Sequence, residues 1–329
     1  MNATVKKKYA YKKIIITGGL GFVGSSLAKK LVPLGPRITL LAKPSSTHSK
    51  KDWIAHEKIK NIEVLEMDMR DTHSLGSAIK NKDVIFDFAA QTQHIKSALS
   101  PREDWETNCE THLNLLACCR ESNPDAKIVF SSSRLVVGKM LRNPVTEEHP
   151  TNPTSIYGIH KLTAEKYNVR YSVIHNLKTT VLRITNVYGE CDQDVHSSPI
   201  PNLFMQKMMR GETVEIHGDG GQLRDYIHID DLTDALIRIG VCDSVYGDIF
   251  NLGCGTSTTF RAMTELVQST VGAGEITYIS RPQIYEDEES GDFVADISKI
   301  CGAISWEPTI GLREGLEKMY RFYKSGNVI

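Results

Sequence analysis

The sequence predicts a doubly wound α/β fold: a parallel sheet covered by helices on both faces, with a smaller lobe towards the C-terminus. Short runs rich in β-branched residues alternate with longer amphipathic segments through the first half of the chain. Near-continuous apolar strands separated by helices are typical of a parallel sheet that is buried on both faces. After Val187 the pattern changes, because proline and glycine interrupt shorter elements. A length of 329 residues accommodates one such unit with an added lobe, at roughly 150 residues per domain.

The individual elements follow from this alternation in chain order. Apolar runs predict strands, and the amphipathic segments between them predict helices. The acidic run Gln283–Asp292 is expected to form a loop. The predicted strands are Lys13–Thr17, Arg37–Leu41, Ile62–Met67, Val84–Phe88, Lys127–Ser131 and Thr179–Arg183, and the predicted helices are Phe22–Leu31, Thr72–Ile79, Trp105–Arg120 and Ser155–Ile174.

Composition excludes several classes of protein. Lys and Arg number 39 against 40 Asp and Glu, and this balance argues against a nucleic-acid-binding protein. The seven cysteines contain no C-x-x-C pair, as expected of reduced thiols in the cytoplasm. The lysine-rich start is followed by an apolar run, Ile14–Ile16, that is too short for a secretory signal. No run approaches the ~20 apolar residues that span a bilayer, so we expect a cytoplasmic protein without membrane contact.

A glycine-rich turn joins the first predicted strand to the first predicted helix. Glycines allow a diphosphate to approach the backbone closely, and the helix N-terminus offers free N–H groups. In this context the turn predicts a Rossmann-like dinucleotide-binding fold, with a tight turn that binds no ligand as the alternative. Residues 1–186 are assigned to this domain, with 225–253 returning to it, and 187–329 mainly to a substrate-binding lobe. The expected phosphate-binding residues are Thr17, Gly18, Gly21, Phe22, Val23 and Gly24.

The end of the second strand bears on the choice of cofactor. An Asp or Glu at this point takes the ribose hydroxyls of NAD in folds of this type, but here Ala42 occupies the position and Lys43 follows it. A cation and the hydroxyls of Ser45 and Ser46 suit the 2′-phosphate of NADP, which a carboxylate would repel. The cofactor is therefore expected to be NADP or NAD, with NADP slightly favoured unless Lys43 is only a solvated loop lysine.

A tyrosine and a lysine at helical spacing, Tyr157 and Lys161, share one face of the helix that follows the fifth strand. A nearby ammonium favours phenolate and so lowers the pKa of a tyrosine, which then exchanges a proton with a substrate hydroxyl. Ser133 follows the fifth strand, at the edge where ligands bind in open α/β sheets. Turn chemistry is the alternative for this serine run. The same spacing recurs at Tyr9 and Tyr320, but neither is expected to reach the cofactor.

Together these residues resemble the extended short-chain dehydrogenase/reductase family, in its nucleotide-sugar epimerase/dehydratase branch, over nearly the whole chain. The resemblance implies that Ser133, Tyr157 and Lys161 form the catalytic triad, with Tyr157 and Lys161 also contacting the cofactor. It further implies cofactor contacts after the third strand, after the fourth strand and from the helix that follows. These contacts are Asp68, Met69, Ala89, Ala90, Gln91 and Asn108.

The later segments resemble the substrate side of the same family. Asn186 lies in the family's asparagine motif, and Arg224 lies in the segment whose arginine clamps the nucleotide diphosphate. Arg281 resembles the second phosphate arginine, and Ser133 is expected to contact the substrate as well. An arginine fork fits a phosphate in geometry and charge, whereas surface arginines in solvated salt bridges are the alternative. No metal site is expected.

The resemblance implies hydride exchange at a ring carbon, C4 in the leading hypothesis, of a nucleoside-diphosphate sugar. The first expectation is a 4-epimerase, and a 4-dehydrogenase or 4-keto-sugar reductase would use the same triad. A non-catalytic regulator that senses NAD(P) is a further alternative, although a sensor needs no proton donor. Arg134 and Leu135 replace the Asp-Glu pair that dehydratases of this branch carry after the triad serine or threonine, so 4,6-dehydration is not expected.

A homodimer is expected as well. In the family, the helices predicted at Trp105–Arg120 and Ser155–Ile174 pair with their symmetry mates in a four-helix bundle. In this chain they carry more apolar side chains than one sheet face needs: Leu113, Leu115, Leu116, Leu162 and Tyr167.

Overall fold

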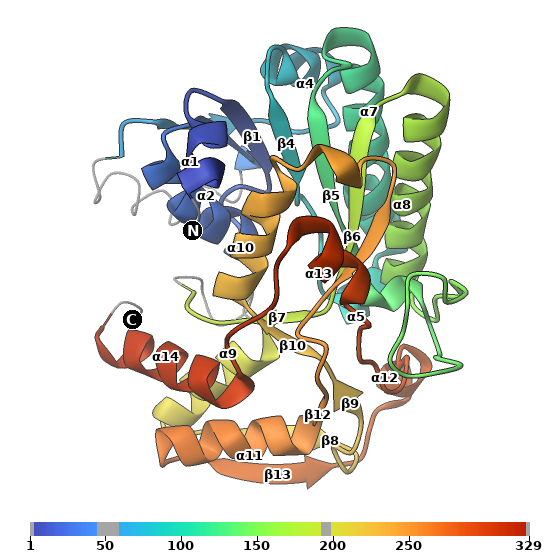
Figure 1. Ribbon diagram of the computed structural model, residues 1–329. Coiled ribbons are helices and arrows are strands. Elements are labelled where there is room, and N and C mark those ends of the chain that lie inside the picture. Colours follow the sequence, from blue (N-terminus) through green and yellow to red (C-terminus); the bar gives the residue numbers. More distant parts are fainter. Residues whose placement is uncertain (1–2, 45–58, 192–198, 327–329) are drawn as a thin grey trace.

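The computed structural model describes residues 3–44, 59–191 and 199–326, and a seven-stranded parallel sheet forms its centre (Figure 1). The strand order is β11-β6-β5-β4-β1-β2-β3. The chain first builds outwards from β1 to β3 and then crosses back to add β4 on the other side of β1, as in a doubly wound fold. The predicted fold class is confirmed. The strands of this sheet are β1 (Lys13–Thr17), β2 (Arg37–Ala42), β3 (Ile62–Glu66), β4 (Val84–Asp87), β5 (Lys127–Ser133), β6 (Lys178–Ile184) and β11 (Ile249–Leu252).

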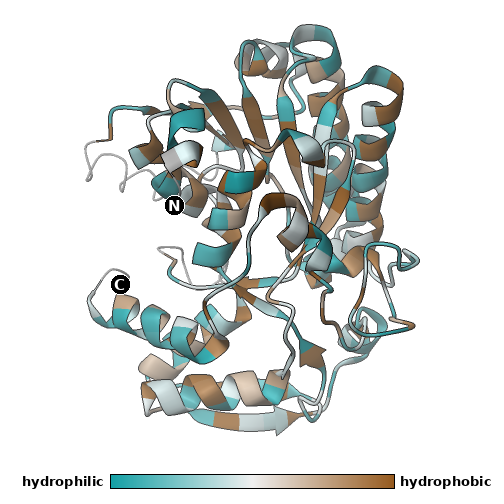
Figure 2. Cartoon of the chain, viewed as in Figure 1, coloured by the Kyte–Doolittle hydropathy of each residue, from teal (hydrophilic) through white to brown (hydrophobic). Residues whose placement is uncertain are grey.

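Helices cover both faces of this sheet. One face packs against α2 and α10, and the other against α4, α7 and α8. The strands are apolar on both sides, as the brown arrows of Figure 2 show, and Ile14–Ile16 of β1 have no exposed surface. The helices of this half are α1 (Ala3–Tyr9), α2 (Phe22–Leu31), α4 (Thr72–Ile79), α5 (His94–Leu99), α6 (Pro101–Trp105), α7 (Thr111–Ser122), α8 (Ile156–His175) and α10 (Ile229–Ile239).

Local sequence signals explain most helix ends, with one departure. The Ser155 hydroxyl oxygen accepts the N–H of Gly158 at 3.0 Å and so caps α8, and Asn176 ends this helix in the left-handed region. The predicted helix Trp105–Arg120 is instead divided into α6, a π-helical turn over Glu106–Glu110, and α7. π-helical turns often mark functional sites, and this one carries a predicted cofactor contact.

The C-terminal lobe has its own apolar core and lies below the sheet in Figure 1. β8 pairs in parallel with β13, and helices α9, α11 and α14 supply the core side chains. The short pair of β7 with β10 lies between the lobe and the sheet, while the pair of β9 with β12 lies beside α11. Helix α13 (Ser298–Ile304) packs on the sheet side, against β11 and α10. The other elements of this half are β7 (Asn186–Tyr188), α9 (Ile200–Met209), β8 (Thr213–His217), β9 (Leu223–Arg224), β10 (Tyr226–His228), β12 (Thr258–Thr259), α11 (Phe260–Val271), β13 (Glu275–Ile279), α12 (Gln283–Asp287) and α14 (Leu312–Lys324).

Two predictions about these elements are wrong. The first half of the acidic run Gln283–Asp292 forms helix α12 instead of a loop. Leu115 and Leu116 do not supply free apolar surface, because they are 0% and 1% exposed and pack into the sheet core. The sequence alone does not show which helix face the sheet covers.

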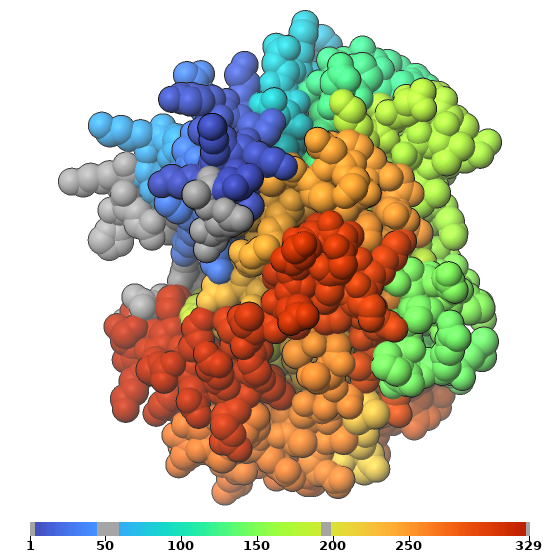
Figure 3. Space-filling model, viewed as in Figure 1, coloured from blue at the N-terminus to red at the C-terminus, as the bar shows by residue number. Residues whose placement is uncertain are grey.

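The loop after β5 is fixed to a distant segment of the chain. Val145 donates its N–H to the carbonyl of Val294 and accepts the N–H of Asp296, both at 2.8 Å. In Figure 3 the green surface of this loop accordingly adjoins the orange-red surface of the C-terminal region. In the described part of the chain, no helix is both long and apolar enough to cross a bilayer.

Candidate active site

The predicted triad residues meet at the carboxyl edge of the sheet. Ser133 is the last residue of β5, while Tyr157 and Lys161 lie one turn apart near the start of α8. The Ser133 hydroxyl shares a hydrogen bond with the Tyr157 phenol and accepts the N–H of Leu135 at 3.2 Å. The three residues are 9%, 8% and 1% exposed, respectively. The structure therefore brings them together in one buried cluster.

The electrostatics of this cluster differ from the prediction. Burial, and then the Asp104 carboxylate, raise the pKa of Tyr157 above its usual value, although the Ser133 hydrogen bond opposes them. Burial lowers the pKa of Lys161 to about 8, and its Nζ lies 4.6 Å from the centroid of the Phe130 ring. The prediction of a lowered tyrosine pKa is wrong for the protein alone, because desolvation of the phenolate outweighs the opposing interactions.

Lys161 and the glycine-rich turn fit a nicotinamide dinucleotide. The Lys161 Nζ is buried and has no hydrogen-bond partner among the described residues, so ligand hydroxyls would satisfy it. In the turn, Gly18 adopts a φ of 61°, and a Cβ on Gly24 would lie 2.5 Å from the Gly18 carbonyl oxygen. Helix α2 begins after Gly21 without a side-chain cap, which leaves its first N–H groups available to a phosphate.

Thr17 supports this turn from within the sheet. Its hydroxyl donates to an Asp87 carboxylate oxygen at 2.8 Å and accepts two backbone N–H groups just after β4, each at 2.9 Å. Its polar capacity is thus used inside the protein, and Thr17 holds the ends of β1 and β4 together. The predicted contacts around the turn are half-buried: Phe22, Val23, Ala89 and Ala90.

At the far end of the predicted cofactor site, Asp68 follows β3 and carries a firm negative charge. Arg70 binds its carboxylate, with Nη2 2.6 Å from Oδ2, and lowers the pKa of Asp68 to about 2. Lys43 adds a smaller effect of the same sign, and its Nζ lies 3.5 Å from the Thr107 hydroxyl oxygen. Lys43, the lysine predicted to bind the cofactor, therefore lies within electrostatic range of the Asp68 carboxylate.

The other residues predicted at this end of the site are buried or lie outside the described residues. Ala42 is the last residue of β2 and is 6% exposed. Met69 is buried in the sheet core, which makes it a packing residue. Ser45 and Ser46 lie outside the described residues.

A buried polar network behind the triad was not predicted. Asp104 accepts hydrogen bonds from Ser97 Oγ at 2.6 Å and from Asn108 Nδ2 at 2.9 Å, and its other oxygen lies 2.6 Å from His160 Nδ1. Asn108, in the π-helical turn, also binds the backbone N–H and carbonyl of Gln91, at 3.2 Å and 3.0 Å. The only signal in the sequence is a histidine between the triad tyrosine and lysine. This network holds α8 against the loop after β4.

The predicted substrate residues lie on the lobe side. Asn186 begins β7 and donates from Nδ2 to the carbonyl of Asp225 at 2.8 Å. Arg224 of β9 is 8% exposed, and its Nη2 lies 2.7 Å and 2.8 Å from the two carboxylate oxygens of Glu289. Arg281 donates to the last carbonyl of β8 at 3.4 Å and lines, with Glu289, an open pocket of about 480 Å³. Arg224 is therefore no surface arginine, although its partner is a carboxylate of the same chain.

Arg134, directly after the triad serine, reaches the same segment. Its Nη1 donates to Ser290 Oγ at 3.1 Å, and its guanidinium lies 5.8 Å from the centroid of the Phe293 ring. Burial, and then repulsion from Arg224, lower the pKa of Arg134 to about 9, so it stays charged at neutral pH. The charges of Arg134 and Arg224 also act on Tyr226, whose buried hydroxyl has no hydrogen-bond partner in the described ranges.

Asp225 is a second residue that sequence reasoning missed. Its buried carboxylate accepts the N–H groups of Cys254, Gly255 and Ala295 at 2.7–3.2 Å and the Thr185 hydroxyl at 3.2 Å. Cys254 and Gly255 follow β11, Ala295 precedes α13, and Thr185 follows β6, so one side chain ties together the segments between sheet and lobe. No motif marks this role.

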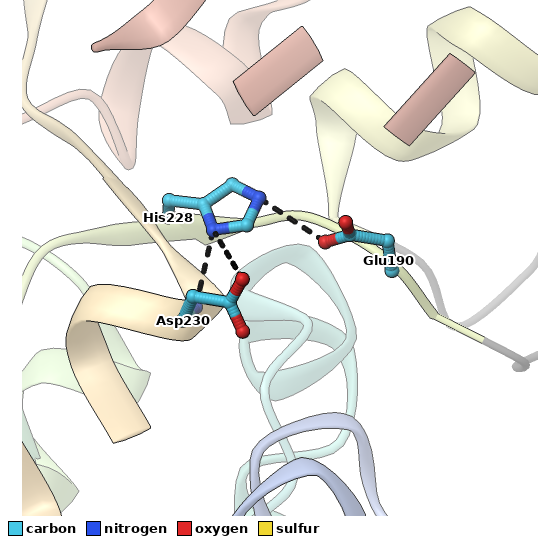
Figure 4. A group of neighbouring side chains, drawn as sticks. All are labelled: Glu190, His228 and Asp230. Carbon is cyan, nitrogen blue, oxygen red and sulfur yellow. Dashed lines mark hydrogen bonds and ion pairs between the residues drawn. The ribbon is translucent and has the colours of Figure 1, made fainter. Parts of the chain in front are cut away.

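A histidine and two acids also cluster between sheet and lobe (Figure 4). His228 lies with Nε2 3.1 Å from Glu190 and accepts the Asp230 N–H on Nδ1. Such a group has the composition of a metal site. However, Lys30 of α2 and Lys318 of α14 both contact the Asp230 carboxylate, at 2.6 Å and 2.5 Å. The cluster is therefore an ion-pair network that joins the two halves of the molecule.

Comparison with known proteins assigns the family. A model of the NAD dependent epimerase/dehydratase family matches residues 14–253, and the chain belongs to this family. The putative UDP-glucose 4-epimerase of Methanocaldococcus jannaschii is 29% identical over 316 residues, which cover 95% of this chain and 99% of the relative. The crystal structure of UDP-glucose 4-epimerase from Thermotoga maritima with UDP-glucose is 28% identical, has a TM-score of 0.85, and the match covers 95% of this chain and 99% of that one.

The family is not limited to epimerases. UDP-glucuronic acid decarboxylase 4 of Arabidopsis thaliana is 27% identical over 95% of this chain and 68% of the relative. The predicted resemblance to nucleotide-sugar epimerases and dehydratases is confirmed.

Proposed function

We propose that this protein exchanges a hydride at C4 of a nucleoside-diphosphate sugar and acts as a 4-epimerase. The observation that carries the proposal is the buried cluster of Ser133, Tyr157 and Lys161 at the same sheet edge as the glycine-rich turn. Relatives of nearly equal length that are named UDP-glucose 4-epimerases support it. The nucleoside diphosphate would bind on the lobe side, at Arg224 and Arg281, with Asn186 beside them on β7.

In this proposal Tyr157 moves the proton of the sugar hydroxyl. Its raised pKa keeps the phenol protonated at neutral pH in the protein alone, so it is ready to donate to a keto sugar. Ser133 shares the hydrogen bond that fixes the phenol and the sugar oxygen. Lys161, with a pKa of about 8, remains mostly charged and would hold the ribose hydroxyls of the cofactor. The nicotinamide supplies the hydride acceptor.

The cofactor contacts proposed for this chain are those at the turn and along the sheet edge. The diphosphate would lie on Gly18, Gly21 and Gly24, and the adenosine end would lie near Asp68 and Lys43. The family is described as NAD dependent; for this chain we propose a modest preference for NADP, because Ala42 leaves no acid at the end of β2.

Two other reactions remain as candidates for specific reasons. A 4-dehydrogenase or keto-sugar reductase would use the same triad, and the preference for NADP would suit a reductase. A 4,6-dehydratase is not proposed, because the side chain after Ser133 is the cation Arg134 and no acid follows it. A sensor without turnover would have no use for the Ser133–Tyr157 hydrogen bond.

We also propose that the protein is a cytoplasmic homodimer. The resemblance to the family carries this proposal, and helices α6 and α8 expose Trp105 and Ile159, 41% and 44% accessible. Light scattering at micromolar concentration should give twice the chain mass of 36.7 kDa. A monomer would contradict the proposal.

The function is tested by incubating the purified protein with UDP-, dTDP-, GDP- and CDP-hexoses and following the sugars by NMR. A 4-epimerase converts each epimer into the other without net change in added NAD(P). A dehydrogenase or reductase instead changes the absorbance of the nicotinamide in proportion to product. Absence of turnover on the whole panel, with NAD(P)H still bound, would leave the sensor.

A further inference from the structure

We propose that Glu289 competes with the substrate diphosphate for Arg224, so that a ligand gains this arginine only by displacing Glu289 towards Arg134. The inference rests on the proposed function, in which Arg224 binds the diphosphate. Glu289 would then determine ligand specificity, because a ligand without a phosphate at Arg224 cannot replace the Glu289 carboxylate.

The first observation is that Glu289 already gives Arg224 what a phosphate would give. Both carboxylate oxygens lie within 2.8 Å of Arg224 Nη2, and one of them also accepts the N–H of Gly291 at 3.0 Å. The arginine side chain is 9% exposed and the glutamate side chain 22%. Although burial alone would raise the pKa of Glu289, Arg224 and Arg134 lower it, so it is ionised at neutral pH. Charge-assisted contacts of this kind are the stronger ones.

The second observation is that Arg134 stands next to this ion pair without a carboxylate of its own. Among the described residues its hydrogen bond is to Ser290, the neighbour of Glu289, and Nε and Nη2 carry none. Its charge nevertheless acts on Glu289 and on Arg224. A small movement of Glu289 would therefore exchange one arginine partner for the other and keep its charge neutralised.

The third observation is that the backbone at Gly291, two residues after Glu289, faces open space. Gly291 adopts a φ of 78°, and a Cβ there would meet nothing within 4 Å. Beyond it the chain is fixed, because Asp292 accepts the N–H of Leu223 at 2.7 Å and Phe293 donates to the Leu223 carbonyl at 3.1 Å. The displacement is thus confined to the part of the chain before Gly291. The nearby Tyr226 hydroxyl, buried and without a partner in the described ranges, offers a donor to an incoming phosphate oxygen.

The consequence is a measurable penalty on nucleotide binding. If Arg224 is available to a ligand in only a fraction of the molecules, the apparent affinity falls by that fraction. Replacing Glu289 with Gln removes the charge and keeps an oxygen for the Gly291 N–H. Glu286→Gln is the matched control, because Glu286 lines the same pocket, is exposed, and has no side-chain hydrogen bond or ion pair among the described residues.

The test is calorimetric titration of UDP, and of inorganic pyrophosphate as a probe that is independent of the base. Glu289→Gln should bind both about 10-fold more tightly than the unmodified protein, and Glu286→Gln should change the affinity less than twofold. If Glu289→Gln gains no more than Glu286→Gln, while Arg224→Ala abolishes UDP binding, the inference is wrong and the proposed function stands. If UDP and pyrophosphate bind to neither the unmodified protein nor Glu289→Gln, both are wrong.

The part assigned to Arg134 is tested by a double-mutant cycle. Arg134→Met should weaken UDP binding when Glu289 is present, because the displaced carboxylate then loses its second partner. In the Glu289→Gln background the same substitution should have no further effect. An equal loss in both backgrounds would mean that Arg134 contacts the nucleotide directly, which would overturn this part of the proposal.

Discussion

The two sides of the candidate active site satisfy their charged groups in opposite ways. On the sheet side, the Lys161 amine is buried with no hydrogen-bond partner in the described part of the chain, and its pKa is lowered to about 8. On the lobe side, the Arg224 guanidinium is bound by Glu289 and two backbone carbonyls. An unpaired buried amine is costly to the folded state, whereas the charge of the buried Arg224 is neutralised by Glu289.

This difference indicates how binding and chemistry are divided between the two sides. The sheet side is organised in advance, since Ser133, Tyr157 and Lys161 keep their places through β5, α8 and the Asp104 network. In the proposal, the lobe side rearranges when a diphosphate displaces Glu289 from Arg224. Substitutions on the sheet side should therefore act mainly on kcat, and substitutions at Arg224 mainly on KM.

On the sheet side, Tyr157→Phe is expected to have the largest effect on catalysis. We expect kcat to fall at least ~10²-fold, a typical size for the loss of general acid–base catalysis. Cofactor binding should survive, because the phenol does not contact the phosphates. Tyr167→Phe, on the same helix, is the control and should retain full activity. Turnover close to normal in Tyr157→Phe would remove the tyrosine from the mechanism.

Arg224→Ala tests the lobe side. We expect KM for the nucleotide sugar to rise about 30-fold, since losing one partner of a desolvated charge pair costs a few kcal/mol. The affinity for NAD(P)H should change little, and kcat should fall less than KM rises. Arg102→Ala, whose side chain is 86% exposed, serves as the control for the loss of a cation. An unchanged KM would leave Arg224 as a structural partner of Glu289.

The sequence predicts the sheet side better than the lobe side for physical reasons. Strand and helix periodicity places Ser133 and Tyr157 at one sheet edge, because both lie on regular elements whose order is fixed by the chain. Glu289 meets Arg224 across 65 residues. It lies just after the short helix α12, on a loop whose path no local pattern specifies. Strand β11 was not predicted, because it lies after Val187, where proline and glycine interrupt the regular alternation of strands and helices.

Asp230→Asn tests the ion pairs with Lys30 and Lys318 that connect the two halves of the molecule. Although burial alone would raise it, Lys30 and Lys318 lower the pKa of Asp230 to about 2. A depressed pKa in the folded state contributes stability that is present above the unfolded value near 3.8 and is lost as the pH falls towards 2. The carboxylate is 34% exposed, so solvent reduces the ~2 kcal/mol implied by the shift to about 1 kcal/mol.

Urea unfolding should therefore show Asp230→Asn about 1 kcal/mol less stable at pH 7. The gap should narrow between pH 4 and pH 2, because the native carboxylate is protonated over that range. Asp125→Asn, in a surface pair 92% exposed, should have no such pH-dependent effect. An equal stability of Asp230→Asn and the unmodified protein at pH 7 would mean that the network contributes nothing to the connection.

The smallest expected effect concerns Lys43. This cation lies on the sheet side, but it has a carboxylate, Asp68, in its neighbourhood, as Arg224 has Glu289 on the lobe side. Ala42 leaves no acid to bind the adenosine ribose, but Asp68 lies within electrostatic range of Lys43 and is ionised, with Arg70 as its main partner. A 2′-phosphate would gain Lys43 and meet the field of that carboxylate, so the preference for NADP(H) should be modest. A partly exposed ion pair contributes ~1 kcal/mol or less, which corresponds to about fivefold in affinity.

Fluorescence titration should show NADPH binding more tightly than NADH by up to this factor, and Lys43→Ala should abolish the difference while leaving NADH unaffected. Lys60→Ala, which removes an exposed lysine just before β3, is the control. If NADH binds at least as tightly as NADPH, and Lys43→Ala changes neither affinity, then Lys43 is only a loop lysine. A preference for NAD would then support an epimerase, for which a retained NAD suffices, over a reductase.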